Sequence, residues 1–197
     1  MMIILLTIIS VISFAFYLMD LKKNKFNIKT MAIISMISAL SYILYIIQFI
    51  KYPQGGGISL FSMLPIMLLS ILYGRTVGVT GGLLFGVLKL LNSAFIVHPI
   101  QFIIDYLLST MVLGLACIFG IDKKYKIICG CLVAVSLSIV LNIISGVVFF
   151  AQYAPKGMNV WLYSFIYNFS TGGVEGILSI IILMILPIKR LEKVIVT

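Results

Sequence analysis

Hydrophobic positions are grouped along the chain into seven long runs, which short polar or basic segments separate. A helix that crosses a membrane needs about 20 mostly apolar residues. Each run therefore predicts one spanning helix, although the third and fourth runs are short. The first run has no basic segment before it and no obvious small-residue cleavage site, so we interpret it as a helix and not a signal peptide. The predicted spans are 2–19, 30–50, 58–73, 76–92, 99–120, 126–151 and 161–187.

The composition supports this interpretation. The 197 residues are 62% hydrophobic and only 10% charged, with a mean hydropathy of +1.25, whereas a soluble domain is about half apolar and a quarter charged. We therefore expect an all-α integral membrane protein. The net charge of +9 does not indicate nucleic-acid binding, because the basic residues are scattered between apolar runs and form no stripe.

The basic residues predict an orientation in the membrane. Most of them fall on one side of a seven-span arrangement, and only Lys51 and Lys156 fall on the other. By the positive-inside rule, the first side is cytoplasmic. The N-terminus is then outside and the C-terminus is cytoplasmic. The residues on the cytoplasmic side are Lys22, Lys23, Lys25, Lys29, Arg75, Lys123, Lys124, Lys126, Lys189, Arg190 and Lys193.

Polar side chains recur at helical spacing in the last three predicted spans, so each set shares one face of its helix. Serine, threonine and asparagine commonly join membrane helices through hydrogen bonds, and this explanation suffices for most of the set. For Asn142 and Asn168, which have aromatic neighbours, we favour contact with a ligand. The sets are Gln101, Asp105 and Ser109; Ser138, Asn142, Ser145 and Phe149; and Ser164, Asn168, Thr171, Glu175 and Ser179.

Three charged residues, Lys89, Asp105 and Glu175, lie in or near the predicted spans. Charges there are costly and usually have a partner. One interpretation is an internal ion pair of Lys89 with Glu175 or with Asp105. If Lys89 pairs with Glu175, Asp105 remains available for a cationic or amine-bearing small molecule. Aromatic rings and one carboxylate together suit a flat cationic ring.

No catalytic residue, metal site or cofactor is predicted. The sequence has no phosphate-binding glycine loop, no His/Glu metal cluster and no nucleophile paired with a base. Cys117, Cys129 and Cys131 are interpreted as small buried hydrophobic residues. Two other classes stay open as alternatives: a membrane-embedded enzyme that uses Asp105 or Glu175 as a base, and a structural assembly protein.

Small residues also recur at intervals of four. Gly78, Gly82 and Gly86 form one row, and Ser35 and Ala39 form another in the second span. Such rows allow helices to approach closely. The spacing alone does not distinguish packing within the chain from a docking surface for another membrane protein.

Two stretches resemble a known family. The chain is similar to the substrate-binding S components of energy-coupling factor (ECF) vitamin transporters, and most similar to the thiamine-specific members. The likeness covers about residues 30–187. It implies a six-helix membrane domain over 30–190. The first predicted helix, over 1–20, lies outside the likeness and is expected as one additional transmembrane helix. The motifs that carry it are Met63-Leu64-Pro65-Ile66, Leu72-Tyr73-Gly74-Arg75, Pro99-Ile100-Gln101 with Asp105-Tyr106, Ser145 to Phe150, Tyr153 to Asn159 and Tyr163 to Asn168.

The resemblance implies specific substrate-binding residues. Asp105 and Tyr106 match an acidic residue and a tyrosine of the family, and Tyr163 and Asn168 match residues that hold the aminopyrimidine of thiamine. The remaining three depart from the family pattern: Phe150 replaces a tryptophan, Asn142 a histidine and Phe95 a tyrosine. A thiamine precursor or another vitamin is therefore an alternative substrate.

The resemblance also implies partners. An S component catalyses nothing; it captures its vitamin at the outer face, under a loop that here spans about 51–59. It then docks on a transmembrane coupling protein that carries two ATPase subunits, and it topples to deliver the substrate. Ser35 and Ala39 stand where the family docks. The expected location is a bacterial cytoplasmic membrane, with lipid around the protein and no nucleic acid.

Overall fold

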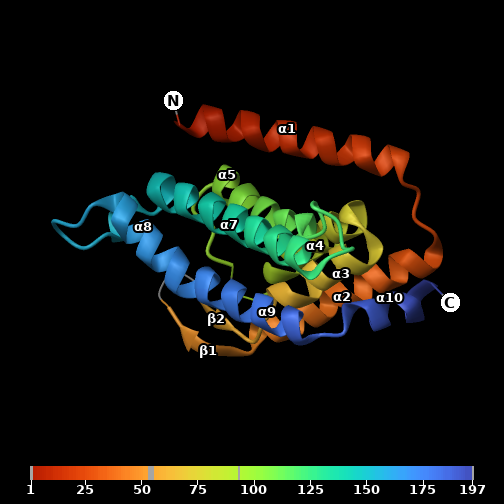
Figure 1. Ribbon diagram of the computed structural model, residues 1–197. Coiled ribbons are helices and arrows are strands. Elements are labelled where there is room, and N and C mark those ends of the chain that lie inside the picture. The colour runs from red at the N-terminus through yellow and green to blue at the C-terminus, as the bar shows by residue number, and fades with distance from the viewer. Residues whose placement is uncertain (1, 53–55, 93, 197) are drawn as a thin grey trace.

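The structure is a computed structural model that describes residues 2–52, 56–92 and 94–196. Helix occurs in every one of the seven predicted spans (Figure 1). Four helical stretches of the described chain are long and apolar enough to cross a membrane: 2–23, 28–46, 124–149 and 160–185. A count of six spans plus one stays a prediction. The helices are α1 (Met2–Lys23), α2 (Ile28–Ile46), α3 (Met63–Tyr73), α4 (Arg75–Lys89), α5 (Pro99–Phe102), α6 (Ser109–Met111), α7 (Lys124–Phe149), α8 (Val160–Asn168), α9 (Val174–Ile185) and α10 (Ile188–Val196).

The second span was predicted to end too late and the third to begin too early. Their ends form two antiparallel strands, β1 (Gln48–Lys51) and β2 (Gly57–Ser59), with Gln48 opposite Ser59 and Lys51 opposite Gly57. The loop between the strands was expected to be flexible, and its tip, 53–55, lies outside the described residues. On either side of that tip, Tyr52 N donates a hydrogen bond to Gly56 O at 2.8 Å. The predicted covering loop is thus largely a hairpin.

Two of the helical stretches contain a π-helical segment. The fifth stretch runs from α5 through the π segment η2 (Ile103–Leu108) and α6 into the 3₁₀ turn η3 (Val112–Leu115). The seventh runs from α8 through the π segment η5 (Phe169–Gly173) into α9. Wide turns of this kind are rare and frequently occur at functional sites. Here both of them border the cavity described below.

The glycine row of α4 packs inside the chain, which decides the question that the spacing left open. A Cβ added to Gly82 would lie 2.2 Å from Thr110 O, and one added to Gly86 would lie 2.0 Å from Tyr106 O. An added Cβ at Gly78 would meet the Ser70 side chain at 2.4 Å. The missing side chains therefore let α4 approach α3 and the η2–α6 segment closely.

The additional helix α1 lies along the outside of the bundle, against α4, α5 and η2. Its buried Leu6 and Tyr17 pack with Ile104 and Leu108 of η2. Figure 1 shows α1 and α2 on opposite sides of the bundle. The extra helix therefore leaves the outer face of α2 uncovered.

Polar contacts connect the C-terminal end of α1, and Asn24 just after it, to the N-terminal half of α4. Tyr17 Oη donates to Thr80 Oγ1 at 3.0 Å, and Asn24 Nδ2 donates to Thr76 Oγ1 at 3.1 Å. Asp20 forms an ion pair with Arg75, the first residue of α4, at 2.6 Å. These contacts hold the end of α1 beside α4.

The sequence did not predict α10. Helix α9 ends at Ile185, and after Leu186 and Pro187 the chain forms α10, which lies against α3. Proline has no backbone N–H and stands at the break between the two helices. The side chains of 188–190 help to line a second cavity, which is discussed below.

Candidate functional site

The predicted substrate-binding residues meet around one cavity. The cavity has a volume of about 180 Å³ and is bordered by α4, η2, α7, α8, η5 and the β1–β2 hairpin. All seven predicted residues line it, although they come from four different regions of the chain. They are Phe95, Asp105, Tyr106, Asn142, Phe150, Tyr163 and Asn168.

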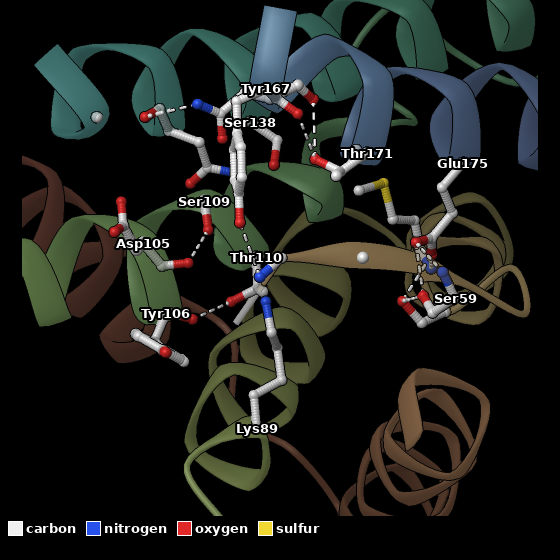
Figure 2. A pocket seen from close by; sticks show the side chains of 18 of the residues that line it. Ser59, Lys89, Asp105, Tyr106, Ser109, Thr110, Ser138, Tyr167, Thr171 and Glu175 are labelled. Carbon is white, nitrogen blue, oxygen red and sulfur yellow. Dashed lines mark hydrogen bonds between the residues drawn. The ribbon is translucent and has the colours of Figure 1, made fainter. Parts of the chain in front are cut away.

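Asp105 lines the cavity from η2 (Figure 2), and one of its carboxylate oxygens has no hydrogen-bond partner within the described residues. Its Oδ2 accepts a hydrogen bond from Gln101 Nε2 at 2.7 Å. Its Oδ1 is buried, and Ser145 lies near it, but neither Oδ1 nor the Ser145 hydroxyl makes a hydrogen bond of normal geometry within the described residues. A buried carboxylate oxygen without a donor is costly. This oxygen can accept a hydrogen bond from a group that enters the cavity.

Asn142 presents a second unsatisfied acceptor. Its Oδ1 is buried without a hydrogen bond among the described residues. The neighbouring Asn168 cannot serve as its donor in this arrangement, because Asn168 Nδ2 donates to the backbone oxygens of Asn142 and Ser164 at 3.3 and 2.9 Å. Asp105 and Asn142 thus both offer acceptors to the same cavity.

Aromatic rings form one side of the site. Phe95 and Phe150 lie with ring centroids 6.0 Å apart, and Tyr163 and Tyr167 lie 6.1 Å apart. The hydroxyl of Tyr106 accepts a hydrogen bond from Phe95 N at 2.9 Å, which fixes the loop before α5 against η2. Rings held in this way can stack on a flat ligand.

Lys89 forms neither of the two ion pairs that the sequence left open. The salt bridges of the described residues are Arg75–Asp20 and Lys126–Asp122, and Lys89 takes part in neither. Its Nζ lies instead 5.0, 5.8 and 5.6 Å from the ring centroids of Tyr45, Phe85 and Tyr106. Aromatic faces attract cations at such distances. Figure 2 shows Lys89 rising into the cavity between Asp105 and Glu175, which stand on opposite sides.

Glu175 is occupied by backbone and hydroxyl donors rather than by Lys89. Its Oε2 accepts from Ser59 Oγ and Ser59 N at 2.5 and 3.3 Å. Its Oε1 accepts from Ser62 Oγ and Met63 N at 2.7 and 3.2 Å. The Met63 N–H belongs to the first turn of α3, where a carboxylate is stabilised by the helix dipole. Glu175 therefore ties the seventh helical stretch to the end of the hairpin.

Sequence reasoning missed several residues that line the cavity, among them Tyr45 of α2 and Tyr167 of α8. Tyr167 Oη accepts a hydrogen bond from Gly56 N at 3.0 Å, across 111 positions of sequence. Its position one turn from Tyr163 was the available signal. Tyr45 gave no signal, because an aromatic residue near a helix end is also typical of a membrane-interface belt.

The described residues contain no group of three or more His, Cys, Asp or Glu side chains that could hold a metal ion. His98 stacks on Phe149 at 5.0 Å between ring centroids, and its Nδ1 accepts from Ile100 N at 3.1 Å. The imidazole therefore caps α5.

Fold and cavity together define a helical membrane protein with an internal cavity that is lined by aromatic and polar side chains. Two solved structures share this fold. One is a ThiT from Listeria monocytogenes, with a TM-score of 0.71 and 24% identity over 82% of this chain and 93% of that chain. The other is described as the S component of a bacterial ECF transporter, with a TM-score of 0.58 and 22% identity over 85% of this chain and 97% of that chain.

Sequence comparison identifies the family. Residues 31–195 match the family of thiamine transporter proteins, and the chain belongs to this family. The thiamine transporter ThiT of Bacillus subtilis is 37% identical over 133 residues, or 61% of this chain and 69% of that protein. ThiT of Lacticaseibacillus paracasei is 26% identical over 154 residues, or 68% of this chain and 77% of that protein. The resemblance to thiamine-specific S components is confirmed, and α1 lies outside the matched residues.

Proposed function

We propose that the chain is the thiamine-binding S component of an ECF importer in a bacterial cytoplasmic membrane. It captures thiamine at its outer face and delivers it inward together with a coupling protein and two ATPase subunits. The observation that carries the proposal is the pair of unsatisfied buried acceptors, Asp105 Oδ1 and Asn142 Oδ1, in a cavity walled by aromatic rings. The names of the curated relatives support thiamine as the substrate.

The chemistry of thiamine matches these groups. Its thiazolium ring carries a fixed positive charge, which the Asp105 carboxylate offsets. Its aminopyrimidine carries an amino group that can donate to Asn142 Oδ1, and Phe150 offers a ring for stacking. Tyr106, Tyr163, Asn168 and Phe95 complete the proposed contacts. A mostly apolar pocket with a few placed polar groups is the usual design of a small-molecule site.

The geometry also bears on the enzyme alternative. Glu175 accepts hydrogen bonds at both carboxylate oxygens, so it is not free to act as a base. Asp105 is the remaining carboxylate of the cavity, and the described residues that line it with Asp105 include no histidine or cysteine. The curated relatives are named as transporters. A binding role without catalysis is therefore the function we propose.

Binding is tested with ligand-stripped protein in detergent, titrated with thiamine by calorimetry. We expect tight saturable binding that weakens by well over tenfold in Asp105→Asn, while binding of an uncharged thiamine isostere changes little. Asp20→Asn is the matched control, because Asp20 lies outside the cavity. Absence of thiamine binding by the wild-type protein would overturn the substrate, and a precursor or another vitamin would then be titrated. Equal affinity in Asp105→Asn would overturn the role of this carboxylate.

Docking on the coupling protein is proposed for Ser35 and Ala39. Both side chains are exposed on α2, on the side of the bundle opposite α1. We expect Ala39→Leu to abolish thiamine uptake in cells and leave binding to the purified protein unchanged. Cys129→Leu, at an exposed position of α7, is the control and should transport normally. Normal uptake by Ala39→Leu would place the docking surface elsewhere.

A further inference from the structure

A second cavity lies at the end of the bundle where α7, α9 and α10 meet. Its volume is about 360 Å³, and none of its lining residues borders the first cavity. Its walls are aliphatic or sulfur-containing side chains, and Cys131 is buried there with an exposed fraction of 1%. The apolar residues that line it are Ile121, Ile127, Ile128, Cys131, Ile180, Leu183, Met184, Ile185, Leu186, Pro187 and Ile188.

The only charged residues among the described lining residues are cationic. Lys124 begins α7, and Lys189 and Arg190 belong to the first turn of α10. All three side chains are exposed, and none forms a salt bridge within the described chain. An empty apolar space therefore lies beside three cationic groups.

One carboxylate, Asp122, interacts electrostatically with Lys189, but its hydrogen bonds go to another lysine. Asp122 accepts hydrogen bonds from Lys126 Nζ at 2.9 and 3.0 Å. This contact lowers the pKa of the Asp122 carboxyl from its usual range, and Lys189 contributes in the same direction. Asp122 is thus already paired with Lys126, which does not line the cavity.

The break between α9 and α10 creates this combination. A helix that continued straight from Ile185 would carry Lys189 and Arg190 away from α7. Instead the chain bends at Leu186 and Pro187, and α10 runs against α3. The bend keeps the basic first turn of α10 beside the apolar walls that α7 and α9 supply.

We propose that this cavity binds one anionic phospholipid of the cytoplasmic leaflet, with acyl-chain carbons against the apolar walls and the phosphate beside Lys124, Lys189 and Arg190. Basic pockets between membrane helices on the cytoplasmic side are suited to acidic headgroups. A free anion would find no polar group on the apolar walls, and an uncharged lipid would leave the cations without a partner. A molecule that is anionic at one end and apolar at the other can contact both the three cations and the apolar walls.

The direct test is native mass spectrometry of the purified full-length protein in detergent. Phosphatidylglycerol and phosphatidylcholine with identical acyl chains are added separately, and inorganic phosphate is added in a third sample. We expect one phosphatidylglycerol to be retained at least tenfold better than phosphatidylcholine, with no phosphate adduct. Equal retention of the two lipids would overturn the proposal, and so would displacement of phosphatidylglycerol by phosphate.

Matched variants locate the site. The triple substitution Lys124→Gln, Lys189→Gln and Arg190→Gln should abolish the preference for phosphatidylglycerol. The control removes the same charge at the same end of the bundle, with Lys22→Gln, Lys23→Gln and Lys25→Gln, whose side chains are exposed and do not line the cavity. Equal loss of the preference in both triple variants would overturn a specific site.

The apolar half of the site has its own variant. Ile128 lines the cavity, whereas its neighbour Cys129 is exposed and does not. Ile128→Trp should fill the space and remove the retained lipid, and Cys129→Trp should not. Retention by Ile128→Trp equal to that of the wild type would overturn an acyl-chain pocket. Thiamine binding plays no part in these measurements, so they stand or fall separately from the proposed function.

Discussion

The backbone N–H of Gly56 donates a hydrogen bond to the hydroxyl of Tyr167, with 3.0 Å between the two atoms. This contact joins the β1–β2 hairpin to α8 across the cavity that both residues line. Glu175 holds the other end of the hairpin through Ser59 and the start of α3. One helical stretch, α8 to α9, therefore fixes the covering hairpin at two points.

The contact with Gly56 predicts a kinetic effect. Tyr167→Phe removes the oxygen that accepts the hydrogen bond but keeps the ring. A net loss of about 1 kcal/mol is typical for such a bond, so we expect thiamine to dissociate about fivefold faster in stopped-flow measurements. Tyr52→Phe is the control, because Tyr52 contacts the Tyr167 ring at 5.8 Å between centroids. An unchanged dissociation rate in Tyr167→Phe would show that the hairpin does not retain the ligand.

The four hydrogen bonds to Glu175 predict a loss of stability in Glu175→Gln. The substitution replaces one acceptor oxygen by an NH₂ group that faces existing donors, and hydrogen bonds to charged groups contribute about 1.5–3 kcal/mol each. We expect a clear fall in the thermal unfolding midpoint in detergent. Asp122→Asn, at an exposed ion pair, should have little effect. Equal stability of Glu175→Gln and the wild type would show that the carboxylate is dispensable for the fold.

Lys89 predicts an increase in affinity. Its ammonium group lines the same cavity as Asp105, so it repels a ligand that carries a positive charge. Lys89→Met keeps the length of the side chain and removes this repulsion. We expect thiamine to bind several-fold more tightly in calorimetry, with Lys51→Met on β1 as the control. Weaker binding in Lys89→Met would instead indicate that Lys89 contacts an electron-rich group of the ligand.

The close approach at Gly86 predicts a packing defect. A methyl group there would lie 2.0 Å from Tyr106 O, so Gly86→Ala must push η2 and its Asp105 away from α4. Overpacking of this kind typically costs about 1–3 kcal/mol. Gly172→Ala is the control, because its added methyl group would meet the flexible end of Met63 at an ordinary contact distance of 3.5 Å. We expect lower thermal stability in the first variant only, and equal midpoints would contradict the role assigned to Gly86.

The hydrophobic runs were sufficient to place all seven helical stretches, because the length and composition of a run determine locally whether it forms a membrane helix. The helical spacing of the polar residues also identified faces that border the cavity, because Ser138, Asn142, Asn168, Thr171 and Glu175 all line it. The family resemblance then selected seven residues that share that space. Whether they bind thiamine stays a prediction.

Other features depended on long-range contacts that a sequence pattern does not contain. The π segments around Asp105 and after Asn168 add a residue to one turn without any distinctive residue type. The partners of Glu175 lie more than 110 positions away, at the end of β2 and at the start of α3. An ion pair with a carboxylate was one interpretation for Lys89, but in the folded chain its ammonium group lies near three aromatic rings.

The contacts of α1 have a consequence for any large movement of the bundle. Apolar packing gives little preference between helix and lipid inside a membrane, so Tyr17, Asp20 and Asn24 decide where α1 stays. All three residues contact α4, so a tilt of α4 would move α1 with it. The moving body would then include α1 as well as the six other helical stretches, and it would be larger on the side away from Ser35 and Ala39. More lipid would have to flow around it than around a protein that consists of the matched residues alone.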